Sequence, residues 1–309
     1  MTKLGNTDLD VYGLNLGGNV FGWTADEPQS FAVLDAYTAA GGNFVDTSDL
    51  YGGGGRSEEI LGNWLAERGN RDDVVVATKV GMWDGRPGLS AKNIQAAAED
   101  SLRRLKTDHL DLWQVHEVAY AGDPERHFMK GGVIEALDRA KQKGLVRFVG
   151  FTGHKDPALH LQMLSYGYPF DSCQMPLNCF DASFRSFEQQ VVPEATRQGI
   201  AVIGMKTFGG EGQAVKKRVV PATDALRYSM SLPVAVTVTG IDSPKVLRQN
   251  LGVARGFRPL GPLELERLRS RYAPQAVDGR FELYKTTAKH EADVGRRQHG
   301  FPPQSELGG

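Results

Sequence analysis

Short apolar segments alternate with amphipathic segments of helical period along most of this 309-residue chain. The alternation predicts strand–helix units, in which each strand is followed by a helix that covers the sheet. We count eight units, and eight favour a closed (β/α)8 barrel, or TIM barrel, over an open doubly wound sheet. A single barrel commonly has about this length, so we expect one domain over residues 1–309.

The predicted strands lie at 12–16, 44–46, 74–79, 110–116, 146–151, 170–174, 200–205 and 234–239. The predicted helices lie at 28–40, 57–68, 90–105, 131–144, 157–166, 184–198 and from 243 onward. Ser57 is expected to cap the helix that it opens, because a serine hydroxyl accepts from the free amides of a first turn.

Turn residues between short apolar positions predict a hairpin at 4–11, ahead of a barrel core of about 12–256. The C-terminal tail, about 257–309, contains one amphipathic helix at 263–271 and then a polar segment. That segment is typical of a partly disordered terminus.

The net charge and the cysteine content indicate which partners and which cellular compartment to expect. The formal net charge is -1, so there is no basic surface of the kind that binds nucleic acid, and no apolar run reaches membrane-spanning length. The two cysteines, Cys173 and Cys179, are too few for a disulfide framework. We therefore expect a cytoplasmic protein with small-molecule partners, and the sequence leaves its oligomeric state open.

Polar residues follow three successive predicted strands where each strand ends. Asp46 ends one strand and Tyr51 lies in the loop beyond it, while Lys79 and His116 end the next two strands. Taken singly, each has an ordinary structural interpretation. The aspartate is typical of a turn and the tyrosine of a half-buried packing residue, while the lysine is typical of the surface and the histidine of a structural role. Because strand ends in a closed parallel barrel surround one pocket, the set predicts an active site.

These residues lie in sequence motifs that resemble those of the aldo-keto reductases. The matching motifs are Asp46-Thr47, Tyr51-Gly52, Ser57-Glu58, Ala77-Thr78-Lys79 and, in a third block, Asp108, Leu110-Asp111-Leu112 and His116. The order and spacing agree over most of the chain. The resemblance implies a (β/α)8 barrel that reduces an aldehyde or ketone to an alcohol with a nicotinamide cofactor.

In that family the tyrosine is the general acid, so the resemblance assigns this role to Tyr51. A tyrosine has a reference pKa of about 10 and is a weak acid at neutral pH, but a neighbouring cation lowers this value. Lys79 can supply the charge, and Asp46 can pair with Lys79 and keep it charged. His116 would orient and polarise the carbonyl group.

The resemblance also implies cofactor contacts near the ends of the later strands. One candidate, Gly18, follows the first strand. The others are Thr152, Gln174, Met205, Lys206, Phe208, Gly209, Gly240, Ser243, Gln249 and Asn250. NADP(H) is the preferred cofactor by resemblance, and NAD(H) is possible. In the same family the C-terminal tail often covers the substrate pocket, which makes Phe281, Leu283, Tyr284 and Phe301 candidates to reach it.

The chain departs from the family pattern after three strands. Thr152-Gly153-His154 replaces the common Ser-Asn pair, and Met205 stands where an aromatic ring often stacks on the nicotinamide. Gly240-Ile241-Asp242-Ser243 lacks the Lys-Ser pair that commonly binds the extra phosphate of NADP, which leaves Lys245 and Arg248 as candidates.

Two other functions remain open from the sequence. A regulatory module of the same fold would bind the cofactor without turnover, and a barrel lyase would use Lys79 to form a Schiff base. The histidines outside the motifs, including His109, His127 and His160, show no metal-site spacing, so we expect no metal.

Overall fold

Eight parallel strands form the closed barrel that the sequence predicts. The computed structural model describes residues 1–86, 89–288 and 290–307. Around the barrel the strands follow one another in the order β10-β3-β4-β5-β6-β7-β8-β9. Their bounds are β3 Leu14–Gly17, β4 Phe44–Asp46, β5 Val75–Val80, β6 Leu110–His116, β7 Val146–Thr152, β8 Ser172–Pro176, β9 Ala201–Met205 and β10 Val236–Gly240.

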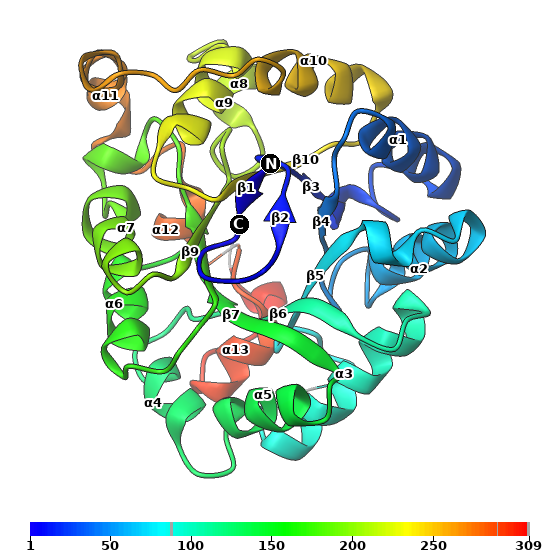
Figure 1. The fold of residues 1–309 in the computed structure, drawn as a ribbon. Coiled ribbons are helices and arrows are strands. Elements are labelled where there is room, and N and C mark those ends of the chain that lie inside the picture. The colour runs from blue at the N-terminus through cyan, green and yellow to red at the C-terminus, as the bar shows by residue number, and fades with distance from the viewer. Residues whose placement is uncertain (87–88, 289, 308–309) are drawn as a thin grey trace.

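Helices surround the barrel and form its outer layer (Figure 1). They are α1 Glu27–Ala39, α2 Arg56–Arg68, α3 Ala91–Leu105, α4 Asp123–Phe128, α5 Val133–Gln142, α6 Pro157–Ser165, α7 Phe187–Arg197, α8 Gln213–Lys216, α9 Ala222–Ser231 and α10 Pro244–Ala254. The predicted helices are confirmed to within a few residues. The sequence analysis missed α4, α8 and the ten-residue α9. Of these, α4 and α8 are too short for a helical period to be visible.

The predicted N-terminal hairpin is confirmed and closes one end of the barrel. Its strands β1 (Thr2–Lys3) and β2 (Asp10–Val11) pair antiparallel, and the hairpin crosses the middle of the ring in Figure 1. Leu4, Leu9 and Val11 are buried against apolar side chains of the barrel interior. Burial of apolar surface stabilises a fold by roughly 25 cal/mol per Å², so the buried side chains of the hairpin stabilise the barrel.

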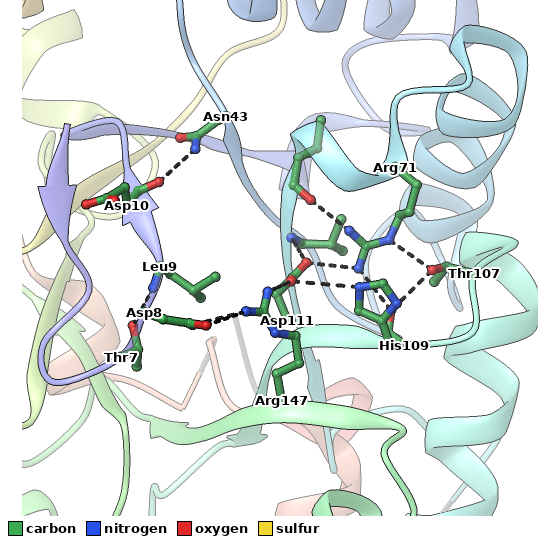
Figure 2. A network of polar contacts seen from close by, with 12 residues as sticks. Thr7, Asp8, Leu9, Asp10, Asn43, Arg71, Thr107, His109, Asp111 and Arg147 are labelled. Atoms are coloured by element: carbon green, nitrogen blue, oxygen red, sulfur yellow. Dashed lines mark hydrogen bonds and ion pairs between the residues drawn. The ribbon is translucent and has the colours of Figure 1, made fainter.

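Polar contacts fasten this hairpin to the barrel (Figure 2). Arg147 contacts Asp8 at 3.0 Å and Asp111 at 2.8 Å, so one guanidinium joins the hairpin to β6 and β7. On the other side, the Asn43 side chain donates to the backbone carbonyl of Asp10 at 2.8 Å. The hairpin therefore closes this end of the barrel, and an active site is expected at the opposite end, where the strands have their C-termini.

Ser57 does not cap α2, so that prediction was wrong. The residue before α2 is Gly55, whose φ of 88° requires the left-handed conformation that glycine adopts most easily. The Ser57 hydroxyl instead donates to the Gly18 carbonyl at 2.7 Å and lies 2.8 Å from the Thr47 hydroxyl. It thus joins α2 to the loops that follow β3 and β4.

The tail is folded rather than disordered over the described residues. It contains α11 Pro262–Ala276, α12 Leu283–Thr286, α13 Asp293–Gln298 and the short 3-10 helix η4 Gln304–Glu306. In Figure 1, α12 and α13 lie inside the ring of outer helices. Phe281, Tyr284 and Val294 are buried, so apolar side chains of the tail pack in the interior of the protein. Among the helices described here, none is long and apolar enough to cross a membrane.

A buried ionic cluster holds α12 against the barrel. The Lys285 ammonium lies 2.6 Å from Asp181 and 2.9 Å from Glu282, and all three side chains are 0% exposed. The Asp181 carboxylate also accepts from backbone amides at the start of α7. Removing the only cation of such a cluster leaves buried carboxylates without compensation.

We therefore expect Lys285→Met to lower the free energy of unfolding by about 3–5 kcal/mol. The measurement is the urea unfolding midpoint of the variant, with the exposed Lys216→Met as control, which should stay within about 0.5 kcal/mol of the unmodified protein. Equal midpoints for the two variants would show that the cluster does not stabilise the tail.

Candidate active site

Lys79 lies at the centre of the predicted catalytic residues. Its ammonium donates to the Asp46 carboxylate at 2.6 Å and to the Thr47 carbonyl at 2.8 Å, and it lies 3.4 Å from the Tyr51 hydroxyl. Asp46 ends β4, Lys79 lies near the end of β5, and Tyr51 is on the loop between β4 and α2. The pairing of β4 with β5 brings residues far apart in sequence to one point.

Burial dominates the electrostatics of these groups. It would lower the pKa of Lys79, but Asp46 and then Tyr51 outweigh it, so the lysine pKa is raised and the ammonium is retained. Burial raises the pKa of Asp46, and Lys79 opposes that rise. The Tyr51 pKa is also raised by burial, with Lys79 acting against it. In the ligand-free protein Lys79 therefore offsets part of the burial effect and does not bring the Tyr51 pKa below its usual value.

His116 ends β6 and faces Tyr51. The two rings lie nearly perpendicular, with 6.2 Å between centroids. Burial lowers the His116 pKa well below its usual value, and the charges of Lys79, His154 and Lys206 add to this effect. The imidazole is therefore neutral near pH 7 and has one N–H to donate. The structure brings all of the predicted catalytic residues together.

A pair of glutamines connects Asp46 to the middle of the barrel. Gln114 on β6 donates to the side-chain carbonyl of Gln174 on β8 at 2.9 Å, and the Gln174 amide hydrogen-bonds to Asp46 and favours its ionised form. Sequence reasoning missed Gln114. Its position two residues before His116, on the same face of a strand, was the signal that could have found it.

The residues predicted to contact the cofactor begin at the adjacent ends of β7, β8 and β9. Thr152 pairs in register with Gln174, and Met205 pairs with Pro176. Lys206 follows with a left-handed φ of 55°, and its ammonium lies 5.0 Å from the centroid of the Tyr284 ring. Tyr284 thus contacts this part of the barrel from the tail.

The loop after β9 packs directly on the tail. Gly209 has a φ of 68°, and a Cβ atom there would lie 2.6 Å from the Phe281 carbonyl oxygen, so no larger residue fits without movement. Phe208 is half-buried in the same loop. Contact with Phe281 and Tyr284 gives this loop its position.

The other predicted cofactor residues fall into two groups. Gly18, in the 3-10 helix η1 (Gly18–Val20), and Gly240, at the end of β10, lie at the mouth near β3. Ser243 caps α10 and Asn250 is buried, with its side chain 3.3 Å from the Thr239 hydroxyl. Gln249 is exposed, so the structure does not turn it toward the barrel in this state.

The residues near β9 and β10 suit the pyrophosphate of a nicotinamide dinucleotide. Burial lowers the pKa of Lys206, so an anion beside it would favour its charged form. The N-terminus of α10 follows β10 closely and presents backbone N–H groups, which favour phosphate binding. A cation and a helix N-terminus are thus available on neighbouring strands of the barrel.

His154 and Glu117 form a buried acid–base pair beside the site. His154 Nδ1 lies 2.8 Å from Glu117 Oε2, and both side chains are less than one tenth exposed. Glu117 also lines a narrow pocket with His116, Met82, Tyr120 and Gln298. Loop residues and the tail together shape this pocket, which the sequence did not predict at this position.

A second, more open hollow adjoins Tyr51 and includes Trp23. Trp23 is 72% exposed in this hollow. Phe21, two residues earlier in the chain, is fully buried and packs in the core. Within the part of the chain that the structure describes, no group of His, Cys, Asp and Glu could hold a metal ion.

Comparisons with known proteins agree with this geometry. The family model for the aldo/keto reductase family matches residues 13–219. An oxidoreductase of Bacillus subtilis (strain 168), YrpG, is 32% identical over 234 residues, which cover 70% of this chain and 69% of that protein. The L-galactose dehydrogenase of Arabidopsis thaliana is 36% identical over 158 residues, which cover 50% of this chain and 48% of that protein.

Solved structures show the same architecture. The aldo-keto reductase AKR11C1 from Bacillus halodurans, in its holo form, superposes with a TM-score of 0.71 at 26% identity, covering 87% of this chain and 95% of that one. Relatives that are reductases and dehydrogenases favour an oxidoreductase over the barrel lyase and over the regulatory module. The chain therefore belongs to the aldo/keto reductase family of nicotinamide-dependent oxidoreductases.

Proposed function

We propose that this protein reduces an aldehyde or ketone to an alcohol with NAD(P)H, and that Tyr51 is the general acid. The observation that carries the proposal is the position of the Lys79 ammonium, which contacts both Asp46 and the Tyr51 hydroxyl beside a neutral His116. A proton donor, a cation and a neutral hydrogen-bond donor are the groups that carbonyl reduction requires.

Each residue then has one task in the reaction. A bound nicotinamide would supply the hydride. Tyr51 gives its hydroxyl proton to the carbonyl oxygen, and Lys79 stabilises the phenolate that remains. His116 holds the oxygen by a hydrogen bond from its neutral ring, and Asp46 keeps Lys79 charged. In the reverse direction Tyr51 accepts the proton.

A panel of aldehydes, ketones and sugars, with NADPH and NADH in parallel, tests this function. We expect cofactor oxidation that depends on the carbonyl compound. Cofactor binding without turnover of any compound would favour the regulatory module. Covalent trapping of a carbonyl compound on Lys79 by borohydride would favour the lyase, because only an imine leaves the substrate attached.

NADP(H) is the preferred cofactor in this proposal, with a smaller preference than in relatives that carry the Lys-Ser pair. Lys245 and Arg248 are exposed on α10, and both are candidates to bind the extra phosphate of NADP. We expect both nicotinamides to bind, and the ratio of the NADH and NADPH dissociation constants to approach one in a Lys245→Ala, Arg248→Ala variant.

Arg255→Ala, at the opposite end of α10, is the matched control and should leave the ratio unchanged. A strong NADPH preference that survives the double substitution would remove these residues from the proposed phosphate site.

A further inference from the structure

Ser48 connects His116 to a buried carboxyl group that the proposed reaction does not use. The Ser48 hydroxyl oxygen lies 3.2 Å from His116 Nδ1, 3.2 Å from an Asp49 carboxyl oxygen and 3.2 Å from the Leu50 amide. Ser48 is 0% exposed and Asp49 is 1% exposed. Ser48 and Asp49 lie between Asp46 and Tyr51 in the sequence, so they belong to the loop that carries the proposed general acid.

The number of available hydrogens limits which hydrogen bonds can form between Asp49, Ser48 and His116. Ser48 has one hydroxyl hydrogen, and the Leu50 amide is always a donor to its oxygen. The hydroxyl can donate either to Asp49 or to His116 Nδ1, but not to both. The other partner must then donate to Ser48, since two acceptors facing each other would repel.

The two arrangements leave different groups facing the substrate. When Asp49 is protonated it donates to Ser48, Ser48 donates to His116 Nδ1, and the histidine hydrogen is on Nε2. When Asp49 is ionised it accepts from Ser48, and His116 must donate from Nδ1, so Nε2 has a lone pair. Nε2 is the ring nitrogen left for a substrate, because Ser48 occupies Nδ1.

We propose that Asp49, acting through Ser48, controls the tautomer of His116 and thereby whether this histidine can donate a hydrogen bond to the carbonyl oxygen. On ionisation Asp49 releases its proton to solvent, while His116 keeps one proton that moves from Nε2 to Nδ1. Asp49 is thus a positioning residue, and the inference rests on the proposed function in so far as it concerns activity.

The surroundings of Asp49 place its ionisation within the working range of pH. Burial raises the pKa of Asp49 to about 7, and the neighbouring Glu58 carboxylate contributes to the rise. Ser48, Arg104 of α3 and the backbone amide of Gly81 act in the opposite direction. Glu58 itself is held by Arg104 at 2.6 Å, so its charge is paired.

The groups that face His116 keep it neutral in both arrangements. Lys79 on β5, His154 after β7 and Lys206 after β9 all act to lower its pKa, in addition to burial. Tyr51 presents an uncharged ring. Glu117 pairs with His154. The histidine therefore changes its tautomer near pH 7 without changing its charge.

Nitrogen NMR of the ligand-free, ¹⁵N-histidine-labelled protein tests the tautomer directly, with His116→Gln used to assign the signal. We expect the hydrogen on Nε2 below about pH 6 and on Nδ1 above about pH 8. Asp49→Asn should keep it on Nε2 throughout, because an amide N–H still donates to Ser48. Ser48→Ala should abolish the pH dependence. An unchanged tautomer in the unmodified protein across this range would overturn the inference.

Kinetics give the second measurement. Above pH 7, kcat/KM for carbonyl reduction should fall about tenfold per pH unit in the unmodified protein and less than about twofold in Asp49→Asn. The exposed Asp26→Asn is the control and should keep the fall. If no carbonyl compound is reduced but the tautomer still changes with pH, the proposed function fails and the inference about His116 stands. A fall that persists unchanged in Asp49→Asn would overturn the link to activity.

Discussion

Tyr51→Phe is expected to lower kcat/KM for carbonyl reduction by about 100-fold or more while cofactor binding survives. The substitution removes the proposed proton donor and almost no volume, and general acid catalysis contributes roughly that factor. The loop keeps its other anchors, because Ser57 still binds Gly18 and the Tyr51 backbone amide still donates to Ser48. The measurements are steady-state kinetics and a fluorescence titration with NADPH.

Tyr166→Phe serves as the control for the loss of a hydroxyl. Tyr166 is 43% exposed at the end of α6, away from the strand ends that hold the site, so its variant should keep full activity. Turnover by Tyr51→Phe at the rate of the unmodified protein would remove Tyr51 from the role of general acid.

Lys79→Met should be inactive even though it retains Tyr51. Burial already raises the Tyr51 pKa, and Lys79 is the largest influence against that rise, so its loss makes the donor weaker still. One pKa unit corresponds to about 1.4 kcal/mol, so a change of roughly two units costs about 100-fold in the chemical step. We expect kcat to fall by at least this factor, with no recovery at high substrate concentration.

The same substitution should also destabilise the fold. Lys79 and Asp46 are 1% and 5% exposed, and breaking a buried pair by removing one partner costs about 3–5 kcal/mol. Adding Asp46→Asn removes the uncompensated charge. We therefore expect Lys79→Met, Asp46→Asn to recover most of the lost stability and none of the activity.

This comparison separates the catalytic role of the lysine from its structural one. The exposed Lys92→Met on α3 is the surface control and should change neither quantity. Near-normal kcat in Lys79→Met would contradict both the charge argument for Tyr51 and the lyase alternative. Recovery of activity in the double variant would show that Lys79 acts only through stability.

The sequence was sufficient for the architecture because the barrel depends on features that are local along the chain. Alternating periods of about 2 and 3.6 residues mark strands and helices, and eight repeats of the unit favour closure. Asp46, Lys79 and His116 could be grouped from the sequence, since parallel strands carry their C-terminal residues to one edge of the barrel. Their roles in the reaction remain predictions that the variants above test.

Side-chain partners were decided only by the tertiary structure. Ser57 fits the pattern of a helix cap, yet it binds Gly18, which is 39 residues away, because burial requires the hydroxyl to find a partner wherever one lies. Gln114 on β6 donates to Gln174 on β8, on the other side of β7, for the same reason. No local pattern reports such contacts.

The tail and the contacts of Asp49 are two further features that the tertiary structure decided and the sequence did not predict. A polar composition favoured disorder after 271, but Lys285 finds Asp181 104 residues earlier, and the buried cluster holds the segment in place. Asp49 lies inside the motif that predicted the site, and the sequence shows only a turn-forming residue there. Its significance depends on the raised pKa and on the distance from Ser48 to His116, 68 residues on. Both are products of burial, which follows from how the whole chain packs.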